Sequence, residues 1–273
     1  MEKDTKEVKV KRRLKKRFKI ILLIIFIILY AFFIGTKGIF IKEFKVETNN
    51  ITKEMEDVKI LQFSDLHYGT VNMKMVNKLI SKINETKPDI VIFTGDLIDE
   101  KYDITEDEKE VLKKNLSNIN AEYGKYYVTG EEDYEETSTL LNQADFINLN
   151  DLEQTIYLQN SSKILLIGKD KTKEYFELNT DENIFKLLAV HNPTDYDKHK
   201  KENFDMVLAG HTHNGQLNIY KLKDLLIKGK YKDSYYKIDN TNLYINPGIG
   251  NSKIRARLFN HPTIYLYRLY STK

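Results

Sequence analysis

Acidic and histidine side chains gather at five points of this 273-residue chain, each directly after a short apolar segment. Short segments rich in Val, Ile, Leu and Phe are typical of buried strands. Because open α/β sheets bind ligands beyond the carboxyl ends of their strands, we expect these side chains to converge at one edge. The five clusters are Ser64-Asp65-Leu66-His67, Gly95-Asp96-Leu97-Ile98-Asp99, Gly130-Glu131-Glu132-Asp133, His191-Asn192-Pro193 and Gly210-His211-Thr212-His213.

The residue types in these clusters favour metal binding. Asp65 and His67, like His211 and His213, are two positions apart, so an extended chain places both members of each pair on the same side. The chain contains no cysteine, which excludes disulfides and thiolate-bound metals and leaves ligands that suit Mn²⁺, Fe or Zn²⁺. A single Asp-x-His or Gly-Asp is more often an ordinary turn. Five clusters in order, each after an apolar segment, indicate a metal centre instead.

The other two histidines are not predicted to be ligands. His199 lies within Lys198-His199-Lys200-Lys201, and we interpret it as part of a solvated helix face. His261 precedes Pro262, and we interpret it as a loop residue.

The segments around the clusters predict the elements that must position them. Apolar residues recur at helical spacing from Val76 to Ile83 before Pro88, and Thr105-x-x-Glu108 is a capping-box motif. Helices alternate with strands early and strands dominate later, so we expect an α/β fold with a mixed sheet or two packed sheets. The expected helices cover 71–86, 105–119 and 134–143. The expected strands cover 58–63, 90–93, 126–129, 155–158, 163–167, 185–190, 206–209, 217–220, 243–245 and 264–269.

The formal net charge of +3 combines two unlike parts. Residues 1–19 hold ten Lys or Arg and three Asp or Glu, so they carry +7 and the other 254 residues carry −4. Every residue from 20 to 34 is hydrophobic, whereas a core helix keeps one polar face. Extension to residue 41 brings this segment near the length that a hydrocarbon core of about 30 Å requires. A cleaved signal peptide is the main alternative, but no small-x-small cleavage site follows.

We therefore expect three parts: a basic cytoplasmic tail at 1–19, a transmembrane signal anchor at 20–41, and one domain at 45–273. The positive-inside rule predicts a single-pass protein of the cell membrane with its N-terminus in the cytoplasm and its domain on the extracytoplasmic side. Arg12-Arg13 is a twin-arginine pair, which leaves export of the folded domain as a second route.

Asp65-x-His67, Gly95-Asp96-x-x-Asp99, His191 and Gly210-His211-x-His213 together resemble the signature of the calcineurin-like metallophosphoesterases. Segments 214–216 and 246–250 resemble its membrane-anchored bacterial branch, so the similarity covers roughly residues 45–270, the whole domain. The resemblance implies a four-layer α/β/β/α sandwich that holds two divalent metal ions.

The resemblance also implies a role for each matching residue. Asp65, His67 and His213 would hold one ion. His191 and His211 would hold the other, and Asp96 would bridge the two. Such a site hydrolyses a phosphoester, here a phosphodiester or pyrophosphate, through a metal-bridging hydroxide. No protein nucleophile is needed, and the chain has no Gly-x-Ser-x-Gly motif.

One cluster departs from the family pattern. The family has Gly-Asn-His followed by Asp or Glu, where Asn is a ligand and His assists the leaving group, but this chain has Gly130-Glu131-Glu132-Asp133. Glu131 remains a candidate metal ligand that adds a negative charge, and Glu132 takes the catalytic position without an imidazolium. Two hypotheses follow: a metal-dependent phosphoesterase with reduced activity, or a membrane-anchored metal-binding protein with a degenerate site.

The sequence gives weaker indications of partners. Residues 220–236 mix Leu and Ile with five lysines, a composition that suits an anionic membrane surface or a solvated connection. Next to a predicted anchor, this composition favours a lipid-linked phosphoester as substrate. Arg255 and Arg257 are candidate phosphate clamps or surface charges. The domain is mildly acidic and has no basic groove, so we expect no nucleic-acid partner.

Overall fold

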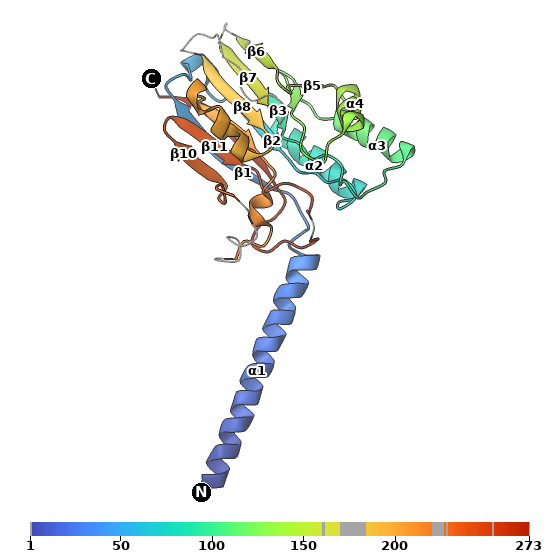
Figure 1. Cartoon of the computed structure of the whole chain (residues 1–273), viewed down its shortest axis with the longest axis vertical. Coiled ribbons are helices and arrows are strands. Elements are labelled where there is room, and N and C mark those ends of the chain that lie inside the picture. The colour runs from blue at the N-terminus through green and yellow to red at the C-terminus, as the bar shows by residue number, and fades with distance from the viewer. Residues whose placement is uncertain are drawn as a thin grey trace.

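The structure is a computed structural model, and it describes residues 2–159, 162–169, 184–219, 227, 229–252 and 254–272. Two six-stranded sheets pack face to face, and a long N-terminal helix projects from the body that they form (Figure 1). The α-helices are α1 Glu2–Phe33, α2 Met73–Thr86, α3 Glu106–Ser117 and α4 Glu135–Gln143. Short 3₁₀ helices are η1 Lys53–Met55, η3 Pro193–Lys198, η4 Lys200–Glu202 and η5 His213–Gly215.

Both sheets are mixed. The first has the order β1-β12-β2-β3-β4-β5, with every neighbouring pair parallel except β12 and β2. The second has the order β10-β11-β9-β8-β7-β6, with parallel pairs between β11 and β7. The strands are β1 Phe40–Thr48, β2 Lys59–Phe63, β3 Ile90–Phe93, β4 Lys125–Tyr127, β5 Phe146–Asn148, β6 Glu153–Tyr157, β7 Lys163–Lys169, β8 Phe185–Val190, β9 Met206–Ala209, β10 Tyr235–Ile238, β11 Thr241–Ile245 and β12 Thr263–Ser271.

Apolar side chains from both sheets fill the space between them, among them Ile92 of β3 and Leu187 of β8. Helices α2, α3 and α4 pack on the outer face of the first sheet through buried residues such as Leu79 and Leu112. On the outer face of the second sheet, Tyr196 of η3 covers the strands. The α/β/β architecture is as predicted, whereas the fourth layer is formed, over the described ranges, by 3₁₀ helices rather than α-helices.

Local signals explain where the helices begin and end. Asn72 caps α2 by accepting a hydrogen bond from Met75 N, and Lys87 ends it in the left-handed region directly before Pro88. Thr105 and Glu108 form both hydrogen bonds of the predicted capping box at α3. The three predicted helices are confirmed to within two residues at each end.

Two expectations about local structure were wrong, and three strands were not predicted. Leu217 forms only an isolated bridge with Leu258, so 217–219 is not a strand, and residue 220 lies outside the described part. His199 is 1% exposed rather than on a solvated helix face, because it lies between two 3₁₀ helices that fold back onto the sheet. Strands β1, β5 and β10 were not anticipated: β5 is very short and the exposed positions of β1 and β10 are largely polar.

Helix α1 ends at Phe33, and β1 begins at Phe40, inside the segment expected to be the anchor. Apolar side chains of α1 from Phe18 onward are mostly exposed, while Ala31 in its last turn is buried against Ala256 and Leu258 of the body. Within the described part of the chain, no helix combines the length and the apolar character needed to cross a membrane. The anchor over 20–41 therefore stays a prediction.

Candidate metal centre

Five of the strands deliver the predicted clusters to one place. β2, β3 and β4 are parallel neighbours in the first sheet, and β8 and β9 are parallel neighbours in the second. Their carboxyl ends therefore meet at one edge of the sandwich, where a hydrogen bond from His211 N to Asp65 Oδ1 (3.0 Å) joins the two sheets. All seven predicted ligand positions lie in this region.

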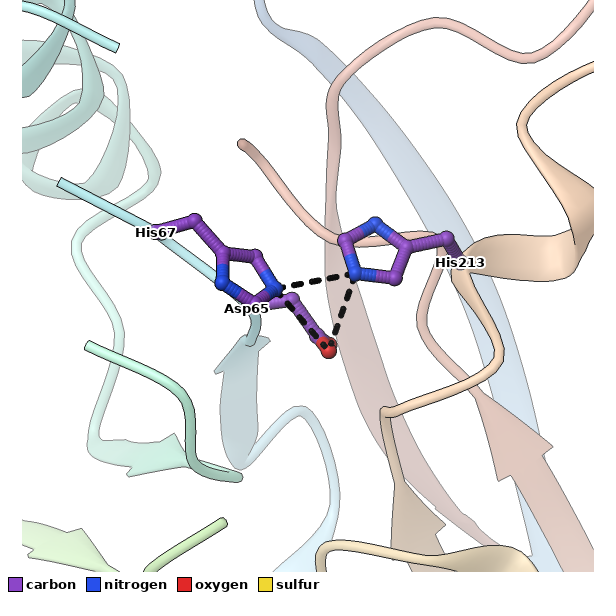
Figure 2. Close-up of side chains that lie close together, drawn as sticks. All are labelled: Asp65, His67 and His213. Carbon is purple, nitrogen blue, oxygen red and sulfur yellow. Dashed lines mark hydrogen bonds and ion pairs between the residues drawn. The ribbon is translucent and has the colours of Figure 1, made fainter. Parts of the chain in front are cut away.

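Asp65, His67 and His213 form the first group of donor atoms (Figure 2). The two Nε2 atoms of the histidines are 3.0 Å apart, and His213 Nε2 is 3.4 Å from Asp65 Oδ1. His67 Nε2 is 4.0 Å from the same carboxylate oxygen. All three residues are buried, so the group is closed to bulk water on most sides.

Glu131, His191 and His211 form the second group. Glu131 Oε2 is 2.8 Å from His191 Nε2, and its other oxygen contacts His211 Nδ1. A carboxylate thus stands where the family pattern has an asparagine amide, and it offers one oxygen toward each histidine.

Asp96 lies between the two groups. Its Oδ2 is 3.2 Å from His191 Nε2 and 3.8 Å from His67 Nε2. The predicted bridging position is therefore occupied by a carboxylate that can reach an ion on either side.

The proton positions at His191 support bound cations. Nδ1 of His191 is 2.7 Å from the Thr94 carbonyl, which can only accept, so Nδ1 carries a proton. In neutral His191 the Nε2 lone pair would face the carboxylates of Asp96 and Glu131, acceptor against acceptor. Burial acts to lower the pKa of His191, but these carboxylates raise it well above its ordinary value, so without a metal ion Nε2 carries a proton that it donates to them. A divalent cation between these atoms resolves that conflict, and the donor set of Asp, Glu and His suits Mn²⁺, Fe or Zn²⁺. The residues present fit a metal centre.

The carboxylate of Glu132 contacts His67 of the first group of donor atoms rather than a histidine of the second. Its Oε2 is 2.9 Å from His67 Nδ1 and accepts a hydrogen bond from Glu100 N (3.1 Å). A carboxylate on the far nitrogen of a ligating histidine fixes the ring and the tautomer. This geometry favours a positioning role for Glu132 over the catalytic role expected from its place in the cluster.

The backbone of the ligand loops is strained. Asp65, His67, Asp96, His211 and His213 all have φ between 41° and 66°, the left-handed region that non-glycine residues seldom adopt. Such strain persists where the surroundings enforce it, and it concentrates at functional sites. Sequence patterns carry no signal for this conformation.

Asp133, to which the sequence assigned no role, fixes the loop that carries Asp96. Its buried carboxylate accepts hydrogen bonds from the backbone N–H groups of Asp96 (2.8 Å), Leu97 (2.9 Å) and Gly130 (2.8 Å). Burial raises the pKa of Asp133, and these hydrogen bonds act in the opposite direction. Gly130 must be glycine here, because a Cβ would lie 2.0 Å from Asp96 Oδ1.

Burial also sets the ionisation of the ligands. It lowers the pKa of His213 well below its ordinary value, and the nearby cationic groups of His67 and Arg257 lower it further, so His213 is neutral and able to bind a metal. Burial acts to raise the pKa of Glu131, but the hydrogen bonds of His191 and His211 outweigh it and hold that pKa well below its usual range.

A cavity of about 550 Å³ opens over both groups. Arg255 lines it and donates a hydrogen bond to Gly69 O (3.2 Å), so its guanidinium lies at the wall of this cavity and its role as a phosphate clamp stays a prediction. Arg257 is neither a clamp nor a surface charge: it is fully buried behind His213, and burial lowers its pKa to about 10. Most of the lysines of 220–236 lie outside the described residues.

Comparison with known proteins agrees with this arrangement. The family model for calcineurin-like phosphoesterases matches residues 58–215. The chain is 29% identical over 259 residues to the uncharacterized metallophosphoesterase YkuE of Bacillus subtilis, covering 89% of this chain and 90% of that protein. It is 25% identical over 244 residues to a "transmembrane protein with metallophosphoesterase domain" of Danio rerio, covering 81% and 55%.

A solved structure, that of a dimetal phosphatase from Danio rerio, is also similar, with a TM-score of 0.48, 10% identity, and coverage of 79% of this chain and 93% of that one. The family match spans more than half of the chain, and all seven candidate ligands, from Asp65 to His213, lie within it. The chain belongs to the calcineurin-like phosphoesterases and is a metal-dependent phosphoester hydrolase.

Proposed function

We propose that this protein hydrolyses a phosphodiester or pyrophosphate at a dinuclear site, with Asp65, His67 and His213 on one ion, Glu131, His191 and His211 on the other, and Asp96 shared. The observation that carries the proposal is the position of Asp96, whose Oδ2 faces a histidine of each group. We infer that the ions are Mn²⁺, Fe or Zn²⁺, since the donors are oxygen and imidazole nitrogen only.

Bound divalent ions would neutralise phosphate oxygens and activate a water molecule for in-line attack. The chain's own residues perform the remaining tasks. Arg255, at the rim of the cavity, can bind a phosphate oxygen through its guanidinium. Glu132 orients His67, and Asp133 holds the loop of Asp96. No general acid stands in the place of the family's histidine, and loss of one such group typically costs roughly 10²–10⁴-fold in rate.

A second candidate function, metal binding without efficient catalysis, is favoured by that same contact of Glu132 with His67. The two functions share the metal centre and differ in turnover. Glu131 supports the metal centre in both cases, because its two oxygens face His191 and His211.

We infer that the protein is held at the cell membrane by its N-terminal helix, as in a membrane-anchored bacterial branch of the family. Support comes from the exposed apolar side chains of α1 between Phe18 and Phe33, from the basic segment before them, and from the relative whose name describes a transmembrane protein. A lipid-linked phosphoester of the cell envelope is the substrate class that fits this location. Membrane fractionation with protease digestion of intact cells tests it: a soluble protein, or a domain shielded from external protease, would contradict the inference.

The test of the site uses the full chain purified in detergent. Bound metal is counted, and hydrolysis of bis(p-nitrophenyl) phosphate is assayed with added Mn²⁺. We expect two ions per chain and turnover that Asp96→Asn abolishes. Asp145→Asn, an exposed aspartate away from the site, serves as the matched control. Two ions without turnover would select the binding protein, and absence of metal would refute both functions.

A further inference from the structure

We propose that Arg257 is a positioning residue for the metal ligand His213, and that it takes its own position from the last turn of helix α1. The inference rests on the dinuclear site proposed above. It adds a residue outside the ligand clusters and connects the N-terminal helix to the metal centre.

Arg257 is a buried cation with a specific set of partners. Its side chain is fully buried, and its Nη2 donates hydrogen bonds to the carbonyls of Pro247 (2.9 Å) and Gly250. The same Nη2 lies 3.4 Å from Nδ1 of His213, and Nη1 donates to Asn260 O (3.4 Å). A buried charge is costly unless hydrogen bonds satisfy it, so this cage of carbonyls fixes the guanidinium in place.

Two residues of the segment 257–260, Arg257 and Asn260, restrain His213. The guanidinium of Arg257 packs against the ring beside Nδ1, on the side opposite Nε2, which faces Asp65 and His67. It restrains the ring by this contact alone, because its Nη2 hydrogens bind the two carbonyls and Nδ1 carries the proton when the Nε2 lone pair is free to bind a metal. Asn260 donates a hydrogen bond from Nδ2 to His213 O (2.6 Å), which fixes the main chain at a residue with φ of 46°. Ring and backbone are thus both restrained by the segment 257–260, and Nε2 is aimed at the other two ligands.

The main chain of Arg257 is in turn held by α1. Arg257 N donates a hydrogen bond to Ala31 O (3.0 Å), a carbonyl in the last turn of the helix. Gly35 approaches so closely that a Cβ there would lie 1.9 Å from Arg257 O. Tyr30 Oη contacts His261 Nε2 (3.2 Å) in the same segment. The end of α1 and the ligand His213 are therefore separated by one residue, Arg257.

Arginine suits this position better than lysine would. Its planar guanidinium offers several donors in a fixed geometry, so it can serve the carbonyls of Pro247, Gly250 and Asn260 at once. A lysine keeps the charge but has one nitrogen on a flexible stem. Arg257→Lys should therefore restore part of what Arg257→Met loses.

The experiment measures metal binding by the full-length protein in detergent. Mn²⁺ titration gives the number and affinity of the sites, and electron paramagnetic resonance separates a coupled pair of Mn²⁺ ions from a single ion. We expect Arg257→Met to weaken one of the two ions roughly 10–100-fold, the size typical for partners of metal ligands, and to replace the coupled spectrum by that of a single ion. Arg268→Met, an arginine on the surface of β12, should leave both sites unchanged.

Gly35→Ala tests the connection to α1, because it displaces the main chain of Arg257 but replaces neither Arg257 nor any residue that binds its guanidinium. We expect it to weaken the same ion as Arg257→Met, by a smaller factor. If Arg257→Met does not fold, Arg257→Lys and Gly35→Ala decide. Two tightly bound ions in every folded variant would overturn this inference alone, whereas a wild-type protein that binds no ion pair would overturn the proposed site as well.

Discussion

The Glu132 carboxylate lies 2.9 Å from His67 Nδ1. The family pattern has a histidine at position 132. The glutamate found here instead contacts His67, a candidate metal ligand, at the ring nitrogen opposite Nε2. Glu132→Gln should therefore weaken metal binding roughly 10–100-fold, because the ring loses the anion that fixes its tautomer. Mn²⁺ titration measures the effect, and Glu135→Gln on α4 is the control. If Glu132→Gln leaves the Mn²⁺ affinity unchanged but shifts the pH–rate profile, Glu132 acts as an acid or base rather than as a positioning residue.

Glu131 determines the charge that the substrate meets. Two divalent ions with the carboxylates of Asp65, Asp96 and Glu131 leave about +1, and Glu131→Asn would raise this to about +2 while keeping a ligand oxygen. Inorganic phosphate should then bind more tightly to the variant. Its inhibition constant, measured against bis(p-nitrophenyl) phosphate, should fall, and a rise would contradict the assignment of Glu131 to the site.

Removal of metal should destabilise the protein. Ions that bind only the folded state stabilise it by about 2.7 kcal/mol at a concentration one hundred times their Kd. The site gains from a cation because the carboxylates of Asp65 and Asp96 lie within 4.8 Å of one another and repel when both are ionised. Differential scanning fluorimetry with and without a chelator measures the change in Tm. In Asp96→Asn the chelator should have a much smaller effect, and an equal effect would argue against ions at this site.

Glu108 should make the free energy of unfolding depend on pH in the acidic range. Hydrogen bonds from Tyr102 and from Thr105 lower its pKa to about 2 from an ordinary 4.5. Because the folded-state pKa is the lower one, this contribution is fully present above pH 4.5 and is lost as the pH falls toward 2. The stability difference between wild type and Glu108→Gln should therefore shrink over that interval. Urea unfolding of metal-free protein measures it, and a difference that stays constant from pH 5 to pH 2 would contradict this role of Glu108.

The convergence of the ligand clusters could be predicted from the sequence because it depends only on where each strand ends. Each cluster follows an apolar run, and neighbouring parallel strands bring their carboxyl ends together whatever the side-chain details. The direction of a single side chain is a finer property. Glu131 and Glu132 are adjacent and alike in type, yet one faces His191 and the other His67.

Burial of charged or polar groups was the other limit of prediction. Arg257 and His199 stand in polar segments, and their local sequence gave no sign that they are buried. Arg257 is accommodated because carbonyls distant in sequence, at Pro247 and Gly250, surround it. Whether a buried polar group finds hydrogen-bond partners depends on the tertiary structure, which the periodicity of the sequence does not encode.

The arrangement of β1 and β12 constrains how the protein matures. β1 follows α1 directly, yet its neighbour in the sheet is β12, paired over all nine residues from Phe40 with Thr263 to Thr48 with Ser271. β12 also separates β1 from β2. The native partner of β1 is therefore available only after β12 has been synthesised. A chain that lacks β12 therefore leaves the edges of β1 and β2 that pair with it open, and open strand edges favour association with other chains.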